Sequence, residues 1–230
     1  MKPDYKNWMP KGMIWPGAVL TTVAGIYTLW GTFMYRTFSY DGKRQLSKKI
    51  IDTVADYVKL PDGGRGLDVG CGSGALAIAC AKRNPNASFV GIDRWGKEYA
   101  SFSRELCVKN AAAEGVGNVE FFRGDATALD FPDETFDAIV SNYVYHNIPS
   151  KDRQAILLES LRTLKKGGTF AIHDIFSKNK YGDMQSFVKK LKDMGYEDVQ
   201  LISTTKGNPI TGFESVWMML SGSAVLVGKK

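Results

Sequence analysis

Residues 66–74 read G-L-D-V-G-C-G-S-G, and this segment constrains the fold of the chain more than any other. Its first part is apolar, as expected of a buried strand, and glycines then occupy alternate positions: Gly70, Gly72 and Gly74. A second apolar run over residues 89–92 ends at Asp93. This order predicts a strand, a glycine-rich turn, a helix, a second strand and an acid. That is the first half of a nucleotide-binding α/β sheet.

The glycines and the acid have separate physical roles in such a sheet. Glycine accepts backbone angles that other residues avoid, and its lack of a side chain lets backbone N–H groups approach a ligand closely. A carboxylate at the end of the second strand, here Asp93, can accept hydrogen bonds from both ribose hydroxyls. The segment therefore predicts a site for a cofactor that contains adenosine.

The spacing of the glycines discriminates between cofactors. A dinucleotide site has G-x-G-x-x-G, with a helix N-terminus directed at a pyrophosphate. Here the spacing is G-x-G-x-G, and Asp68 precedes the first glycine by two residues. A carboxylate there would repel a pyrophosphate and attract a cation, such as the ammonium group of a sulfonium cofactor with an amino-acid tail. The pattern D-x-G-x-G-x-G resembles the first motif of the class I, Rossmann-like, S-adenosylmethionine-dependent methyltransferases.

This resemblance implies a set of cofactor contacts. It assigns Asp93 to the ribose, with Arg94 beside it, and it assigns Asp125 in Gly124-Asp125-Ala126 to the adenine amino group. The L-x-K-G-G-x-F pattern at residues 164–170 also resembles the family. The full set of predicted cofactor-binding residues is Asp68, Gly70, Gly72, Gly74, Asp93, Arg94, Asp125, Ala126 and Ser141.

The remaining elements follow in the order that such a sheet requires. Apolar runs predict strands at 119–123, 136–141, 169–175, 199–203 and 224–228, and helical periodicity predicts helices at 150–164 and 185–194. Ser150 is expected to cap the first of these helices, and Gly167-Gly168 to end it. We expect a doubly wound α/β fold with a seven-stranded, mostly parallel sheet over residues 46–230, preceded by an apolar segment over residues 1–45.

The acceptor of a class I enzyme is expected beyond the end of the fourth strand, where the strand order reverses. Asn142, Tyr143 and Tyr145 are predicted to line its site, although the tyrosines fit a core equally well. We expect His146 or His173 to contact the acceptor, with His146 as a general base. A purely structural role for His146 fits the sequence equally well. Large catalytic motifs are not required, because the sulfonium is already activated.

Charge and composition exclude several partners. The net charge of +6 lies within residues 1–50, which hold eight Lys or Arg and two Asp, whereas residues 51–230 hold 22 of each sign. The neutral domain argues against a nucleic-acid substrate. Two histidines and three unpaired cysteines exclude a histidine-rich metal site and favour a reducing compartment. His173 and Asp174 are adjacent on a strand and point to opposite faces, so no metal is expected.

Residues 12–35 contain no charge, and about 20 apolar residues suffice to span a bilayer. Trp15, Trp30 and Tyr35 lie near the ends of the segment, and the larger basic cluster follows it, which would keep the domain cytoplasmic. Small residues dilute the segment and form a stripe at helical spacing. Two interpretations remain: a membrane-associated helix, or a cap over the acceptor site such as relatives carry.

Together these features predict methyl transfer from S-adenosylmethionine to a small-molecule or lipid-soluble acceptor. One alternative is a nicotinamide-dependent oxidoreductase, which the glycine spacing and Asp68 disfavour. The other is a membrane-anchored module that binds the cofactor without turnover. The sequence specifies neither the acceptor nor the oligomeric state.

Overall fold

The computed structural model describes the backbone of residues 11–97 and 101–230, with the side chains of residues 11–16 excepted. The chain divides into two compact units, Met1–Ser47 and Lys48–Lys230. The second unit holds the sheet and most of the helices that the structure describes, and the first is dominated by the helix α1 (Lys11–Phe38).

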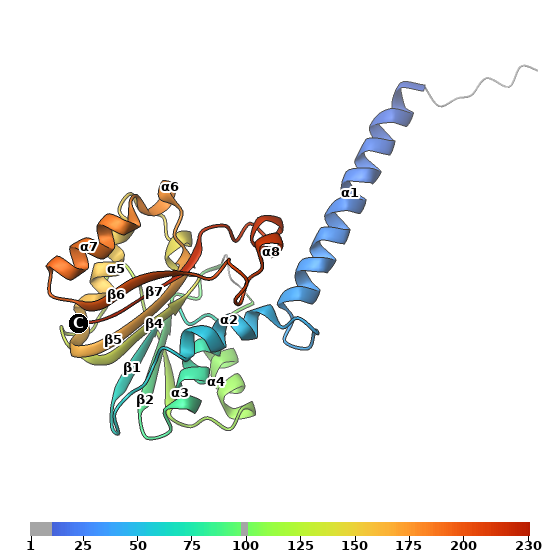
Figure 1. The fold of residues 1–230 in the computed structure, drawn as a ribbon. Coiled ribbons are helices and arrows are strands. Elements are labelled where there is room, and N and C mark those ends of the chain that lie inside the picture. Colours follow the sequence, from blue (N-terminus) through green and yellow to red (C-terminus); the bar gives the residue numbers. More distant parts are fainter. Residues whose placement is uncertain (1–10, 98–100) are drawn as a thin grey trace, which may run out of the picture. The chain divides into compact units, whose positions relative to one another are not determined.

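Seven strands form one sheet in the order β3-β2-β1-β4-β5-β7-β6 (Figure 1). They are β1 (Arg65–Val69), β2 (Ser88–Asp93), β3 (Val119–Arg123), β4 (Phe136–Asn142), β5 (Leu164–Ile175), β6 (Glu197–Ser203) and β7 (Ser223–Lys229). Strands β1 to β5 pair in parallel, and β7 runs antiparallel between β5 and β6. This is the predicted seven-stranded, mostly parallel α/β sheet. The order reverses between β1 and β4, where such sheets bind their ligands.

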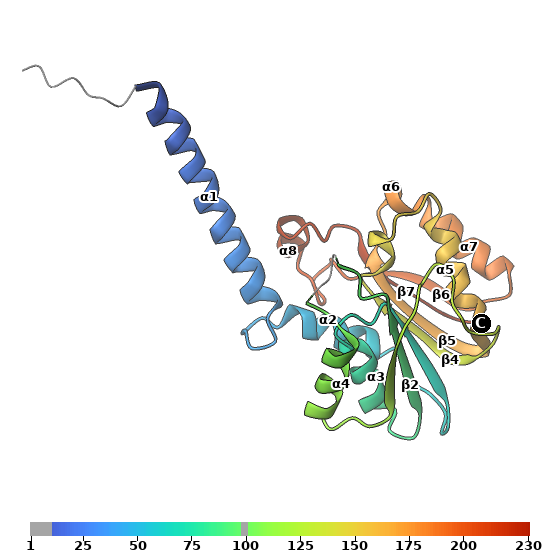
Figure 2. The same ribbon diagram turned by 180° about the vertical axis from the view of Figure 1, so that it is seen from behind.

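Helices cover both faces of the sheet (Figures 1 and 2). One layer contains α2 (Leu46–Ala55), α3 (Ala75–Arg83) and α4 (Arg104–Ala113), and the other contains α5 (Arg153–Arg162) and α7 (Met184–Asp193). Alternate residues of β4 separate into the two cores: Ala138 and Val140 join one, and Ile139 joins the other. Two short helices, α6 (Lys178–Tyr181) and α8 (Gly212–Trp217), follow β5 and β6.

The prediction for residues 150–164 was wrong at both ends. Helix α5 begins after Asp152, whose carboxylate accepts a 2.9 Å hydrogen bond from the Ala155 amide, while Ser150 only shapes the preceding turn through the Asp152 amide. The helix ends before Thr163, and Gly167-Gly168 belong to β5. The β4–β5 register shifts there, because Phe136 pairs with Leu164 but Ala138 pairs with Thr169. The glycines therefore form an irregularity in a strand and do not end a helix.

The carboxyl ends of the parallel strands define one edge of the sheet, here called the carboxyl edge. The glycine turn follows β1, Asp93 ends β2, and a short 3₁₀ helix, η2 (Tyr145–Asn147), follows β4. Ile175, at the end of β5, pairs with Ser223, and Ala224 pairs with Ser203 at the end of β6. The connection between β6 and β7, which contains α8, therefore also lies at the carboxyl edge.

Helix α1 contains a candidate membrane span at Gly17–Phe38, with a mean hydropathy of 1.3 in its most apolar window. No residue of that window is buried, and Val19, Leu20 and Ile26 are all more than half exposed. The hydroxyls of Thr21, Thr22, Thr28 and Thr32 donate to carbonyls four residues earlier. These bonds satisfy the polar groups locally, as an apolar environment would require. Twenty-two helical residues extend about 33 Å, close to the hydrocarbon thickness of a bilayer.

Candidate functional site at the carboxyl edge

The glycine turn depends on glycine at each of its three positions. Gly70, Gly72 and Gly74 have φ angles of 76°, 55° and 84°, in the left-handed region that other residues rarely adopt. The packing is equally restrictive: a Cβ on Gly70 would overlap Val144, and one on Gly74 would lie 2.9 Å from the Phe121 ring. The amides of Gly70 and Cys71 both donate to the Ile92 carbonyl. The turn is thus held against the end of β2 and the start of the loop after β4.

Asp68 lies beneath this turn and is almost fully buried, with 1% of its surface exposed. Its Oδ2 accepts a hydrogen bond from the Ala77 amide at 3.0 Å. Its Oδ1 has no hydrogen-bond partner among the described residues. Burial raises the pKa of Asp68 to about 8, although the Ala77 bond opposes the shift. A buried oxygen without a partner is costly, so a donor or cation supplied by a ligand would stabilise this carboxylate.

Asp93 joins the glycine turn to the segment after β2. One carboxylate oxygen accepts from the Gly72 amide at 2.9 Å, and the other accepts from the Trp95 amide at 2.7 Å. The Trp95 indole N–H returns a bond to the Gly72 carbonyl at 2.9 Å. Each carboxylate oxygen can accept a further bond, so the ribose contacts predicted for Asp93 remain chemically available. Trp95 has a φ of 44°, a strained value for an aromatic residue.

Asp125 and Ala126 form a turn directly after β3. One Asp125 oxygen accepts from both the amide and the hydroxyl of Thr127, at 2.8 and 2.7 Å. These bonds lower the pKa of Asp125, and the charge of Arg94 adds to the effect. The carboxylate is therefore anionic near neutral pH and fixed in orientation. Arg94 itself is exposed.

A histidine–aspartate pair lies at the ends of β4 and β5. His146 Nδ1 is 2.5 Å from Asp174 Oδ1, and the His146 amide donates to Asp174 Oδ2 at 3.2 Å. Asp174 is fully buried, whereas 13% of the His146 side chain is exposed. The Lys180 ammonium donates to the His146 carbonyl at 2.9 Å. An imidazole held at Nδ1 by a carboxylate leaves Nε2 as its other acid–base position.

The other predicted residues at this edge have internal partners. His173 is fully buried; its Nδ1 bonds to Asn142 Oδ1 and its Nε2 to Thr204 Oγ1, and burial lowers its pKa to about 4. Tyr145 lies in the core with its hydroxyl against Ser160, and the buried Ser141 hydroxyl donates to the Val69 carbonyl. These side chains fix the carboxyl edge from inside.

Tyr143 lies between the histidines. Its ring makes an edge contact with His173 at 4.5 Å and with His146 at 6.0 Å between centroids. Its hydroxyl is 2.9 Å from the Ser223 hydroxyl, and its φ is 57°. Burial raises the pKa of Tyr143 above its usual range. Tyr143 thus connects the loop after β4, at the carboxyl edge, to the start of β7, a contact that the sequence did not indicate.

Sequence reasoning also missed the partnership of His146 with Asp174. The two lie 28 positions apart in the chain, and only the β4–β5 register, in which Asn142 faces His173, brings them together. The sequence did offer a partial signal for this pair. Asp174 follows His173 on a strand, so its side chain must point to the opposite face of the sheet from that of His173. Among the described residues, no group of three His, Cys, Asp or Glu side chains could hold a metal ion.

Comparison with known proteins assigns the family. The profile of the methyltransferase domain matches residues 67–168, from β1 to the glycine pair of β5. The demethylmenaquinone methyltransferase of Geobacillus kaustophilus is 34% identical over 51% of the chain. The 27-O-demethylrifamycin SV methyltransferase of Amycolatopsis mediterranei is 26% identical over 76% of it. Over residues 67–168 the chain is similar to the class I S-adenosylmethionine-dependent methyltransferases, and these matches support that family for it. S-adenosylmethionine is accordingly the cofactor of the domain.

The chain spans only part of the length of the curated relatives that it matches. It covers 47% of the demethylmenaquinone methyltransferase and 63% of the 27-O-demethylrifamycin SV methyltransferase. A third relative, the sterol 24-C-methyltransferase of Gibberella zeae, is 31% identical over 56% of the chain, which covers 32% of that protein. The chain thus spans between about a third and two thirds of the length of these three curated relatives.

Solved structures extend the likeness to most of the sheet. A methyltransferase from Aquifex aeolicus superimposes with a TM-score of 0.56 at 19% identity, over 82% of this chain and 93% of that one. Geranyl diphosphate methyltransferase, solved in complex with GPP and sinefungin, gives a TM-score of 0.61 at 13% identity, over 82% of this chain and 79% of that one. The [4+2]-cyclase SpnF gives 0.60 at 20% identity, over 81% and 82%. At these identities the likeness concerns the fold alone.

Proposed function

We propose that this chain transfers the methyl group of S-adenosylmethionine to a small, lipid-soluble acceptor that gives up a proton in the reaction. The observation that carries the proposal is the His146–Asp174 pair, which lies at the carboxyl edge beside the glycine turn. The curated relatives act, by their names, on sterol, quinone and polyketide-type molecules, and these acceptors suit the exposed apolar helix of this chain.

The residues at the turn fit the cofactor. The unpartnered oxygen of Asp68 and its raised pKa call for a cation, and the ammonium of the amino-acid tail supplies one. Asp93 takes the ribose hydroxyls, and Asp125 with Ala126 takes the adenine edge. Glycine at position 70 lets the turn pack directly against Val144, because a side chain there would overlap that residue. When bound, the sulfonium supplies an activated methyl group that leaves a neutral thioether behind.

The chain then has to orient the acceptor, remove its proton and exclude water. Asp174 holds His146 in the tautomer with hydrogen on Nδ1, so Nε2 can accept the acceptor's proton as the new bond to the methyl carbon forms. Lys180 fixes the His146 backbone, and Tyr143 borders the same space. His173 is not part of this chemistry, because both its nitrogens have buried partners.

We further propose that α1 associates with a membrane and keeps the domain close to acceptors dissolved there. The exposed apolar face of Gly17–Phe38 and the net charge of +6 over residues 1–50 support this, because anionic lipids attract such segments. Recovery of the full chain in a detergent-free soluble fraction after a salt wash would contradict it. Partition into membranes is the expected result.

The test of the proposed function is incubation of the full chain with S-adenosylmethionine carrying an isotopic methyl label, followed by separate aqueous and organic extraction of a cell extract. Label is expected in the organic fraction. Tight cofactor binding without label in any fraction would instead favour a binding module or, as the fold of the SpnF cyclase allows, a reaction that does not consume the methyl group.

A further inference from the structure

The connection between β6 and β7 carries an exposed apolar surface that the proposed methyl transfer does not use. Four side chains form it, here called the α8 patch: Phe213, Val216, Trp217 and Met219, which are 66%, 73%, 46% and 71% exposed. Phe213 and Trp217 stack, with ring centroids 5.9 Å apart and planes at 12°. Soluble proteins rarely expose large apolar side chains in such a cluster unless it binds something.

The patch is presented by a well-anchored element. Ile210, Met218 and Leu220 are buried beneath it, and Thr211 and Glu214 form a reciprocal capping box at the start of α8. The Phe176 amide after β5 donates to the Gly222 carbonyl, and the Ser223 amide donates to the Leu220 carbonyl. These contacts orient one face of α8 inward, so the outward direction of the patch is a property of the fold.

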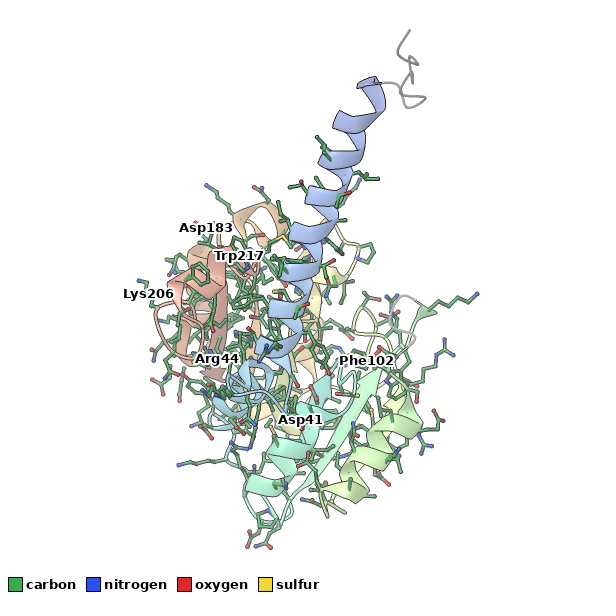
Figure 3. All side chains as sticks on the ribbon, turned by 90° about the vertical axis from the view of Figure 1, so that its right-hand side faces the viewer. Asp41, Arg44, Phe102, Asp183, Lys206 and Trp217 are labelled. Carbon is green, nitrogen blue, oxygen red and sulfur yellow. The ribbon has the colours of Figure 1, made fainter. Side chains whose placement is uncertain are left out.

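The patch also lies at the edge where the acceptor must enter. Residues 204–222 join the end of β6 to the start of β7, at the carboxyl edge. Ser223, immediately after the connection, bonds to Tyr143, whose ring contacts His146. Lys206 and Trp217 both belong to this connection (Figure 3). The patch and His146 therefore lie at the same edge of the sheet.

The chemistry of the patch favours a lipid surface over a protein partner. Tryptophan and phenylalanine are suited to the boundary between headgroups and acyl chains. Lys206 and Glu214 are the charged residues of the connection, and Glu214 is 6% exposed and used in the cap, so the connection itself presents no exposed acid to an anionic headgroup. Four side chains also offer less area than the roughly 800 Å² per partner of a standard dimer.

We propose that the α8 patch contacts the surface of a phospholipid bilayer, so that the acceptor passes from the bilayer to the site beside it. The inference rests on the proposed function, because it supplies a route for a lipid-soluble acceptor. Seven residues join α1 to α2, and this short connection gives the patch a high effective concentration at any bilayer that holds α1. The contact of α1 with the bilayer and that of the α8 patch then reinforce each other.

The chain offers a matched pair of positions for the test. Met219 is 71% exposed at the carboxyl edge, and Met194 is 53% exposed just before β6, at the opposite edge of the sheet. Cys71, Cys80 and Cys107 are all buried, so a single introduced cysteine takes a thiol-reactive fluorophore selectively. We would label Met219→Cys, Met194→Cys and, on α1, Leu20→Cys in the full chain. Calorimetry with sinefungin would verify that each variant retains its cofactor site.

Each labelled chain would be reconstituted in vesicles of three parts phosphatidylcholine to one part phosphatidylglycerol, with and without lipids that carry a nitroxide on the acyl chain. The label at position 219 is expected to shift to the blue and to lose most of its emission to the nitroxide. The label at position 194 is expected to keep its emission. Adding Val216→Asp should restore most of the emission at 219, whereas Val216→Leu should not.

Equal, unquenched emission at 219 and 194, together with quenching at position 20, would overturn the α8 inference and leave membrane association by α1 intact. A label at 219 that is shielded only at high protein concentration, and not by nitroxide lipid, would overturn it in favour of contact between copies. Quenching of the fluorophore at 219, combined with no transfer of the isotopic methyl group to any acceptor, would support contact of the α8 patch with the bilayer. It would contradict the proposed function instead.

Discussion

At the scale of single residues, three carboxylates at the carboxyl edge have three different environments. Asp68 is buried with an unpartnered oxygen, Asp93 accepts two backbone bonds, and Asp125 is fixed by Thr127. Burial raises the pKa of Asp68, because it outweighs that residue's single hydrogen bond, whereas the Thr127 bonds lower the pKa of Asp125. Under the proposed function, these three environments suit a cation, sugar hydroxyls and a base edge in turn.

Replacement of Asp93 by Ala tests the ribose assignment. The variant should bind S-adenosylmethionine more weakly by about 1–3 kcal/mol, the scale of a lost hydrogen-bond partner of a charged group. Titration calorimetry of parent and variant measures the difference. Because Asp93 also holds the Gly72 and Trp95 amides, thermal unfolding without cofactor serves as the control. Unchanged affinity would show that the ribose binds elsewhere.

Replacement of His146 by Ala tests the proposed base. Loss of general-base catalysis should lower kcat/KM for the acceptor roughly 100- to 10,000-fold, with cofactor affinity unchanged. Asp174→Asn should lower it through the same step, so the double variant should be little worse than His146→Ala alone. Steady-state kinetics on the extracted acceptor measures all three. Additive losses would contradict the idea that the two residues work as a unit.

At the scale of elements, sequence and structure agree where local pattern decides and differ where pairing decides. The strand over 119–123 and the glycine turn follow from apolar runs and glycine spacing, which are local properties. Residues 164–168 could not be assigned this way, because two lysines and two glycines after a helix read as its end. Their strand pairing depends on β4 and on the carbonyl of Lys230, which accepts from the Gly167 amide.

The site shows the same division. The acids and glycines predicted to bind the cofactor lie near one another because each lies at or just beyond the carboxyl end of a strand in the parallel part of the sheet. The histidine roles could not be assigned, since burial decides them: His173 is enclosed by Asn142 and Thr204, and His146 retains an exposed edge. Neither environment is visible in the neighbouring sequence.

Gly70→Ala tests the contact between the glycine turn and the loop after β4. At a φ of 76°, alanine is strained by about 1–2 kcal/mol, and its Cβ would also displace Val144. We expect lower stability together with a loss of cofactor affinity. Gly117→Ala is the control, because a Cβ there meets nothing within 4 Å, and its effect should stay within about 0.5 kcal/mol. Chemical unfolding and calorimetry measure both quantities, and equal effects of the two changes would contradict this packing.

At the scale of the whole molecule, the buried His173 links folding to pH. Its pKa of about 4 in the folded state lies below the ordinary 6.5, so the unfolded chain binds the proton more readily. Its contribution to stability is therefore complete above pH 6.5 and is lost as pH falls toward 4, by about 3 kcal/mol in total. Asp68 has the opposite slope, because its raised pKa favours folding at lower pH.

A difference measurement isolates the histidine. The free energy of unfolding of the parent minus that of His173→Gln, determined by denaturant titration between pH 4 and 7, should fall as pH falls from 6.5. Asp68 contributes equally to the pH dependence of the free energy of unfolding of both proteins, so its contribution cancels in the difference. A difference that does not change with pH would show that His173 titrates alike in the folded and unfolded chain.

The chain as a whole combines the neutral residues 51–230, which hold the sheet, with the basic residues 1–50, which hold the apolar helix α1. Transfer of labelled methyl groups from S-adenosylmethionine into organic-soluble material tests this combination most directly, with the parent compared with Asp93→Ala and His146→Ala at equal protein concentration. The account predicts organic-soluble label with the parent and strongly reduced label with each variant. Label that appears only in protein or nucleic acid, or equally with all three proteins, would contradict it.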